Sequence, residues 1–114
     1  LFDAAGAMAF DLENAALAPR ILDLALAVLL FPLEDPGSAG RALSRDEWRA
    51  FLAAYLQEAP PLMRAERALW PAALEYMRLE WGTWHLTEGV ETDPANLGYL
   101  EDLLTLDAAR YALP

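Results

Sequence analysis

The chain has no cysteine and no lysine, and it has a single histidine among its 114 residues. Without cysteine it can form no disulfide, no thiolate nucleophile and no zinc-thiolate site, and one histidine is too few for a metal site built from several histidines. A chain that needs no disulfides suits a reducing compartment, so we expect it in the cytoplasm.

Positive charge is also scarce, because eight arginines are outnumbered by eighteen aspartates and glutamates, for a net charge of −10. Such a chain repels the phosphates of nucleic acids and of anionic membranes, so we expect neither as a partner. The longest apolar stretch, 21–33, is interrupted by Asp23 and Pro32 and falls short of the roughly 20 residues that a membrane-spanning helix needs. It predicts a buried helix instead.

Apolar residues make up 56% of the chain, which is too much for a disordered acidic tail and enough for a packed core. Alanine and leucine contribute 23 residues each, and both favour helix over sheet because neither is β-branched. We therefore expect a single unit over 1–114 with a mainly α fold, in which a short N-terminal β-hairpin precedes an assembly of about four or five helices.

The β-hairpin is expected over residues 1–14. Asp3 and Gly6 frame a tight turn between two short apolar runs, and glycine accepts the left-handed conformation that such a turn can require. In the second strand, the period of two residues would place Asp11 and Glu13 together on one face. The sequence begins inside the first expected strand, so we expect a longer protein to continue upstream.

Apolar residues recur at helical spacing in several segments, which cover about 20–31, 44–58, 62–85 and 94–112. The second segment opens with Ser44 and Glu47 at the spacing of a capping box. Pro71 lies inside the third segment, where we expect a kink or a split of the helix. The last segment opens with Asp93 as a helix cap and Pro94 at the first helical position.

Residues 10–25 form the segment that carries recognisable chemistry. A hydrophobic run ends in Asp11, a short loop follows, and the triplet Asp23-Leu24-Ala25 opens a buried helix twelve residues after Asp11. This pattern resembles the metal-binding segment of the aminoglycoside phosphotransferase-like kinases, a superfamily that includes type II homoserine kinases and choline kinases. Arg20 occupies the arginine position of the family pattern, and Pro19 replaces the usual aspartate or glycine.

The resemblance implies an ATP- and Mg²⁺-dependent kinase that phosphorylates a hydroxyl of an amino alcohol, an amino acid or an aminoglycoside. It implies that Asp11 is a Mg²⁺ ligand and binds the nucleotide through the metal, since a carboxylate at a strand end can hold Mg²⁺ against phosphates. Glu13 would be an additional metal carboxylate. Asp23 would be a buried structural anchor that accepts hydrogen bonds from the backbone of the catalytic loop.

Two features of these kinases are missing from this sequence, namely a catalytic loop of the form His-Gly-Asp and the nucleotide-binding lysine of an N-terminal lobe. The resemblance therefore implies a C-terminal subdomain, part of a protein-kinase-like C-terminal lobe, with no catalytic residue of its own. Alone, this chain is expected to be inactive.

Each candidate residue also has a simpler interpretation. Asp11 could cap a turn at the end of a strand, Glu13 could be a solvated loop carboxylate, and Asp23 could interact with the dipole at the start of its helix. His85 is expected to be a packed side chain and not a metal ligand or base. Three of the four tryptophans fall on apolar core stripes, so we expect core packing and not a cage for a quaternary ammonium group.

A second interpretation of the whole chain stays open, in which it is a freestanding acidic helical domain that binds another protein or oligomerises. The high apolar content of a short chain motivates this interpretation. Self-association alone would not separate the two, because a kinase fragment would also expose apolar surface. Most carboxylates of the helices, including those of Glu66 and Glu80, are expected on a solvated face.

Overall fold

The computed structural model describes residues 2–3, 6–7, 18–30, 41–87 and 94–114. These residues are mainly helical, and their helices are α1 (Arg20–Leu30), α2 (Arg45–Glu58), α3 (Arg64–Thr87), α4 (Pro94–Leu104) and the short 3₁₀ helix η2 (Ala108–Tyr111). In this described part of the chain, none of the helices combines the length and the apolar character that crossing a membrane requires.

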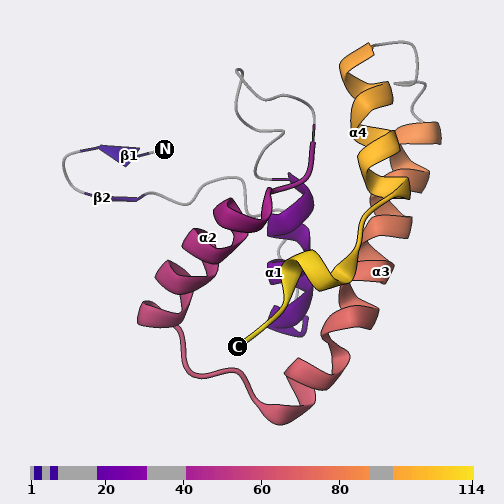
Figure 1. Ribbon diagram of the computed structural model, residues 1–114. Helices are drawn as coiled ribbons and strands as arrows, with labels where there is room; N and C mark the ends of the chain where they lie inside the picture. The colour runs from indigo at the N-terminus through magenta and orange to yellow at the C-terminus, as the bar shows by residue number, and fades with distance from the viewer. Residues whose placement is uncertain (1, 4–5, 8–17, 31–40, 88–93) are drawn as a thin grey trace.

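The N-terminal β-hairpin of the expected fold class was wrong. Strands β1 (Phe2–Asp3) and β2 (Gly6–Ala7) are only two residues long, and their antiparallel pair lies to one side of the helices (Figure 1). The rest of the expected second strand, residues 8–14, lies outside the described residues. An isolated two-stranded pair is marginal in water, and this alanine-rich segment lacks the β-branched residues that favour strands. The domain is therefore a helical one.

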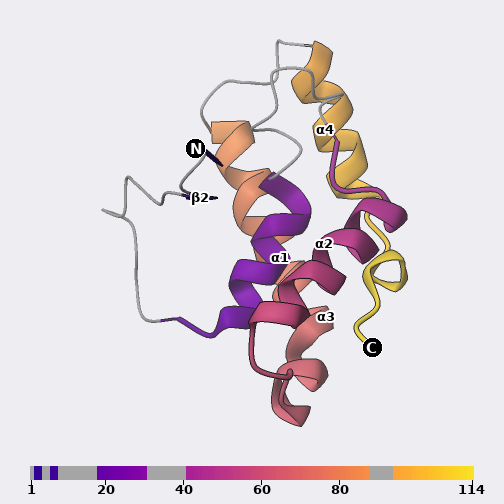
Figure 2. The same cartoon turned by 90° about the vertical axis from the view of Figure 1, so that its left-hand side faces the viewer.

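Helix α1 is the central element of the domain. Its apolar side chains recur at i, i+3, i+4, i+7 and i+8, and each is at most 2% exposed: Ile21, Leu24, Ala25, Val28 and Leu29. This stripe packs mainly against α3, and the two helices run in the same general direction (Figures 1 and 2). The buried helix predicted from the apolar run is confirmed.

Helix α2 begins and ends at the residues that its sequence signals predict. The Ser44 side chain accepts a hydrogen bond from the Glu47 backbone N–H at 3.3 Å, and the Glu47 carboxylate accepts one from the Ser44 N–H at 2.6 Å. This reciprocal capping box satisfies two of the N–H groups at the helix start. The helix stops at Glu58 because the prolines at 60 and 61 lack the backbone N–H that would continue it.

Helix α3 is continuous across Pro71, so the split considered from the sequence was wrong. Pro71 is exposed to solvent, and its ring replaces only the single N–H that would otherwise bond to the Arg67 carbonyl. The kink stays a prediction. The C-terminal half of α3 packs against α4, which runs back along it, and this pair forms one end of the molecule (Figure 1).

The last expected helix is shorter than its apolar pattern suggested, because α4 ends at Leu104 and not near residue 112. The Thr105 hydroxyl donates to the Glu101 carbonyl at 2.9 Å, and the Asp107 carboxylate accepts from the Ala109 N–H at 2.9 Å to start η2. Such local side-chain bonds compete with continued helix. The break lets Tyr111 turn into the core, where it is 0% exposed.

An aromatic cluster closes the core between α2, α3 and the C-terminal segment. The Trp48 and Trp70 rings stack with centroids 5.2 Å apart, and Tyr111 meets Trp48 edge to face at 6.2 Å. The Trp70 indole N–H donates to the Tyr111 carbonyl at 2.6 Å, and the Trp48 N–H donates to the Ala112 carbonyl at 3.3 Å. The expected core packing is therefore confirmed for Trp48 and Trp70.

Candidate functional site

The two residues predicted to bind metal, Asp11 and Glu13, lie outside the described residues, so their predicted roles stay predictions. The described part of the kinase-like segment begins with the residues just before Arg20 and continues into α1. Among the residues that the structure describes, no three Asp, Glu or His side chains come together as a metal site would require.

Arg20, the first residue of α1, joins the kinase-like segment to the start of α3. Its Nε and Nη2 donate to the two carboxylate oxygens of Glu66 at 2.6 and 2.8 Å, a bidentate pair across 46 positions of sequence. Its Nη1 and Nη2 also donate to the carbonyls of Pro60 and Pro61 at 2.7 and 2.8 Å. A fixed planar fork of donors suits this arrangement, which an ammonium group could not reproduce.

The electrostatics of this pair keep both partners charged. The hydrogen bond from Arg20, supported by the Met63 backbone N–H at 2.6 Å, lowers the pKa of Glu66 to about 2. The same hydrogen bond raises the pKa of Arg20. Because the described groups already occupy its guanidinium, Arg20 serves to anchor the segment. Glu66 is only 8% exposed, so its expected place on a solvated face was wrong.

Asp23 lies in the first turn of α1 and is exposed, whereas the following Leu24 and Ala25 are 1% and 0% exposed. No hydrogen bond to its carboxylate is found within the described ranges. A carboxylate in the first turn interacts favourably with the helix dipole, so this simpler interpretation fits the chain as described. The role as a buried anchor of a catalytic loop is not seen in this chain and stays a prediction.

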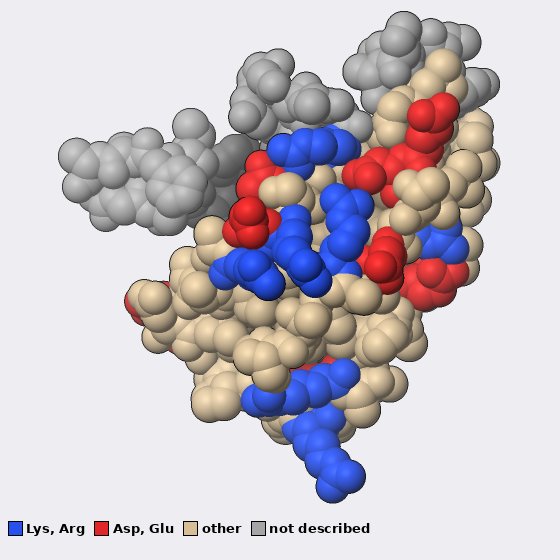
Figure 3. All heavy atoms as spheres, viewed as in Figure 1, with Lys and Arg blue, Asp and Glu red and all other residues tan. Residues whose placement is uncertain are grey.

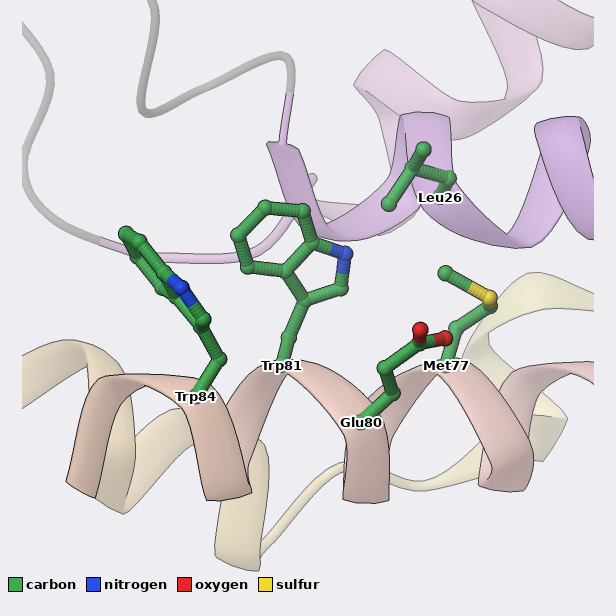
Figure 4. Close-up of a pocket in the computed structure, with 5 residues that line it drawn as sticks. All are labelled: Leu26, Met77, Glu80, Trp81 and Trp84. Carbon is green, nitrogen blue, oxygen red and sulfur yellow. The ribbon is translucent and has the colours of Figure 1, made fainter. Parts of the chain in front are cut away.

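A cavity of about 240 Å³ opens between α1 and α3, and the residues that line it are Leu26, Met77, Glu80, Trp81 and Trp84. The Trp81 and Trp84 rings meet edge to face, with centroids 5.2 Å apart at 76°. Figure 4 shows the Trp81 indole between Trp84 on one side and Leu26 and Met77 on the other, with the Glu80 carboxylate directed toward the same space.

The four tryptophans form two pairs that differ in how far they are exposed to solvent. Trp48 and Trp70 are 1% and 4% exposed, whereas Trp81 is half-buried and Trp84 is 48% exposed. The expectation that three of the four tryptophans pack in the core is confirmed by Trp48, by Trp70 and by the partly buried Trp81, which packs against the core. Trp84 is the exposed fourth. The signal that could have found the cavity is the spacing of 77, 80, 81 and 84, which places a carboxylate among apolar residues on one helix face.

The His85 ring contacts the Trp81 and Trp84 rings and is buried, as expected for a packed side chain. It is 6% exposed, and its ring centroid lies 5.0 Å from that of Tyr99, which is 0% exposed. Burial lowers the pKa of His85 and raises that of Tyr99. Within the described chain, neither ring nitrogen of His85 nor the Tyr99 hydroxyl has a hydrogen-bond partner.

The arginines are mostly committed to ion pairs with neighbouring carboxylates. On the face seen in Figure 3, blue and red side chains lie side by side around α2 and η2. The pairs of the described chain are Arg20–Glu66, Arg41–Glu47, Arg49–Asp46, Arg78–Glu75 and Arg110–Asp102. This pairing leaves little positive charge for recognising an anionic partner.

A second cavity, of about 380 Å³, runs along the junction of α3 and α4. Most of the residues that line it are leucines, and Arg78 and Glu101 are its charged lining residues. Several of these leucines are strongly exposed, namely Leu79 at 54%, Leu86 at 62%, Leu97 at 47% and Leu104 at 77%. Exposed apolar surface of this kind is typical of contact sites.

No protein-family model matches the chain, and comparison with curated proteins and with solved structures gives no significant match. No family is therefore shown for this protein.

Proposed function

We propose that this chain is the C-terminal part of an ATP- and Mg²⁺-dependent kinase that transfers phosphate to a hydroxyl of an amino alcohol, an amino acid or an aminoglycoside. The partners of the intact protein are then a nucleotide and a small-molecule acceptor, and its compartment is the cytoplasm. The chain alone is inactive, because it supplies no His-Gly-Asp loop and no lysine.

The segment from Asp11 to Ala25 carries this proposal. Its family-like arginine, Arg20, is fixed by four hydrogen bonds to Glu66 and the Pro60 and Pro61 carbonyls. Its Leu24 and Ala25 are core residues. The C-terminal end of the segment is thus held rigidly, which supports a role in positioning, because phosphoryl transfer depends on accurately placed charges.

The donor chemistry of the segment suits Mg²⁺, which prefers carboxylate oxygens and is held in kinases by one or two carboxylates together with substrate phosphates. Asp11 and Glu13 would provide such oxygens. When bound there, Mg²⁺ would offset the negative charge on the nucleotide phosphates. The contribution of this chain is then to present the Asp11 carboxylate from a segment anchored at Arg20.

Asp23 supports the same proposal through its exposure. The kinase resemblance pairs this residue with the backbone of a catalytic loop, and this sequence contains no such loop. Asp23 is exposed beside the core residues Leu24 and Ala25. This exposure leaves its carboxylate available to a catalytic loop from an upstream part of the protein. Asp23→Asn would then weaken the docking of that loop in the intact protein.

The first test is the coding sequence upstream of Leu1. We expect a His-Gly-Asp-type loop and a lysine-bearing N-terminal lobe there, and the absence of both would contradict the proposal. In the intact protein, Asp11→Ala should abolish ATP-dependent transfer to a panel of amino alcohols, amino acids and aminoglycosides. Circular dichroism and the melting temperature should be unchanged, because the substitution touches only the metal ligand.

The matched control for this test is Asp46→Ala, which removes an aspartate whose side chain is 91% exposed on α2. It should leave transfer intact. Glu13→Ala should lower transfer less than Asp11→Ala if Glu13 is an additional and not the principal metal carboxylate. Full activity of the Asp11→Ala protein would remove Asp11 from the mechanism.

The exposed leucines of α3 and α4 favour a second candidate function, a helical protein-interaction or oligomerisation domain. The double substitution Leu86→Glu and Leu104→Glu places charge on this apolar surface without altering a core position, since both residues are more than half exposed. On this candidate, the substitutions abolish partner capture or self-association measured by sedimentation. A kinase fragment would lose self-association as well, so only the upstream sequence separates the two candidates.

A further inference from the structure

We propose that the groove between α3 and α4 binds one amphipathic helix of another protein, a helix that carries basic residues on its polar face. The groove is the cavity of about 380 Å³ between the C-terminal half of α3 and α4, which runs back along it (Figure 1). Such binding goes beyond phosphate transfer, and it gives the second candidate function, on which it rests, a partner of definite chemistry.

Both helices present leucine to this groove at helical spacing. Leu79 and Leu86 lie two turns apart on α3, and Leu97 and Leu104 lie two turns apart on α4. All four side chains are between 47% and 77% exposed. Two neighbouring helices that each leave a leucine stripe uncovered suit a third helix, whose own apolar residues recur at i, i+3, i+4 and i+7.

The size of the groove fits a single helix better than a second copy of this chain. Two helical turns span about 10 Å, and a helix with its side chains is about 10–12 Å across. A stable dimer buries about 800 Å² on each partner, which a patch of this length does not provide alone. Two copies would also each bring a net charge of −10, and their repulsion opposes self-association.

Charge on the groove selects a basic partner. Helix α4 has two carboxylates and no basic residue. Asp102 is paired with Arg110, whereas Glu101, which lines the groove, has no ion-pair partner in the described chain. Arg78, the basic lining residue, is already held by Glu75. The uncompensated charge of the groove is therefore negative, and a basic residue on the incoming helix would complement it.

Gly82 lines the groove in the interior of α3, where glycine weakens a helix relative to alanine. Within the described chain, a Cβ at this position would meet only the Leu103 Cδ1, at 3.9 Å, which is an ordinary contact. Packing of α3 against α4 therefore does not require glycine here. A glycine on the wall of the groove lets the backbone of an incoming helix approach closely.

The test compares the binding of two amphipathic peptides, measured by fluorescence anisotropy at physiological ionic strength. Each peptide has about 14 residues, or about four helical turns, with leucine at i, i+3, i+4 and i+7, and the two differ only in having lysine or glutamate elsewhere. The lysine peptide should bind saturably and about tenfold more tightly than the glutamate peptide. Equal affinities, or no saturable binding of the lysine peptide, would overturn the proposal.

Neutral substitutions locate the site, because a chain with net charge −10 attracts any cationic peptide. Leu86→Gln combined with Leu104→Gln should weaken binding of the lysine peptide by about tenfold, since apolar surface is lost at constant charge. The matched control combines Met63→Gln with Leu69→Gln, which lie at the other end of α3 and are 63% and 56% exposed. It should leave affinity unchanged, and equal weakening by both double variants would contradict binding in the groove.

Two further pairs of variants test charge and close approach. Glu101→Arg should weaken binding by about fivefold more than Glu80→Arg, which changes the net charge equally but lines the other cavity. Gly82→Ala should weaken binding by about threefold, whereas Gly98→Ala, where a Cβ would meet nothing in the described chain within 4 Å, should not. Equal effects within both pairs would overturn the proposal. Asp11→Ala should bind the lysine peptide normally, so this proposal and the kinase proposal fail separately.

The other possible occupants give distinct results. A dimer that Leu86→Gln and Leu104→Gln together dissociate in sedimentation would assign the groove to a second copy. A longer intact protein that no longer binds the lysine peptide would assign the groove to another part of that protein. Tighter binding of the glutamate peptide would keep an interaction domain but exclude a basic partner. Each of these results would overturn the proposal.

Discussion

At the scale of single residues, the hydroxyl groups of two buried tyrosines differ in their hydrogen bonding. The Tyr111 hydroxyl donates to the Leu43 carbonyl at 2.7 Å, whereas the Tyr99 hydroxyl has no hydrogen-bond partner among the described residues, although both residues are 0% exposed. A buried polar group without a partner costs its desolvation energy and returns nothing. Both rings are buried in the core, but the Tyr111 hydroxyl stabilises the fold and the Tyr99 hydroxyl costs desolvation energy.

Phenylalanine substitutions test this contrast directly. Tyr111→Phe should lower the free energy of unfolding by about 1–2 kcal/mol, because the Leu43 carbonyl loses a donor in the core. Tyr99→Phe should leave stability unchanged or raise it, since it removes an unpaired hydroxyl. Urea unfolding followed by circular dichroism would measure both, and equal losses from the two substitutions would contradict the explanation.

At the scale of elements, helix ends are decided by side chains a few residues away. Ser44 and Glu47 begin α2, the prolines at 60 and 61 end it, and the Asp107 carboxylate starts η2. The Glu47 carboxylate has a second role, because Arg41 donates to its two oxygens at 2.7 and 2.9 Å. The capping box thus also fixes the segment that leads into α2.

The serine cap is open to a graded test. Ser44→Ala should lower the free energy of unfolding by about 1 kcal/mol, because the Glu47 N–H loses its acceptor. Ser44→Gly should lower it by only a few tenths of a kcal/mol. The difference arises because glycine leaves the N–H groups open to water. Thermal and urea unfolding would measure both variants, and equal costs would show that the serine hydroxyl is not what caps α2.

At the scale of the whole molecule, polar contacts tie together elements that are distant in sequence. The Leu43 N–H donates to the Val28 carbonyl and the Ala42 N–H donates to the Asp102 carboxylate, each at 2.8 Å. The segment before α2 is thereby joined to both α1 and α4. The Arg20–Glu66 pair joins the start of α1 to the start of α3 in the same way. The Arg20–Glu66 connection depends on an ionised carboxylate.

Acid should weaken the fold through the Arg20–Glu66 and Arg41–Glu47 ion pairs. The pKa values of Glu47 and Glu66 are lowered from 4.5 to about 2, so the unfolded chain binds more protons than the folded one in that interval. Their contribution to stability is fully present above about pH 4.5 and is lost as the pH falls toward 2. The urea midpoint, measured across this interval, should fall.

The control for this prediction removes one of the two groups. Glu66→Gln should make the urea midpoint depend less on pH between 4.5 and 2, whereas Glu58→Gln, on an exposed carboxyl of α2, should not. The comparison with a matched variant is needed because protonation of the other carboxyls also relieves the repulsion of a chain with net charge −10. An unchanged pH dependence in Glu66→Gln would contradict the role given to the Arg20–Glu66 pair.

The sequence by itself determined the helical character of the described chain, the buried stripe of α1 and the start of α2 at Ser44. These features depend on periodicity and caps that act within a few residues. It also supplied the kinase-like motif, whose metal residues Asp11 and Glu13 stay predictions. The hairpin was wrong as an element of the expected fold, because its described strands β1 and β2 are only two residues long and a longer two-stranded pair needs support from packing that local turn signals do not provide.

Only the tertiary structure decided which side chains of similar type share an environment. Glu66 is buried because Arg20, 46 positions away, is brought to it by the packing of α1 on α3. Trp70 is in the core and Trp84 borders a cavity, although both lie on α3. A helical pattern defines a face, but what covers that face depends on how distant elements pack, which no local spacing encodes.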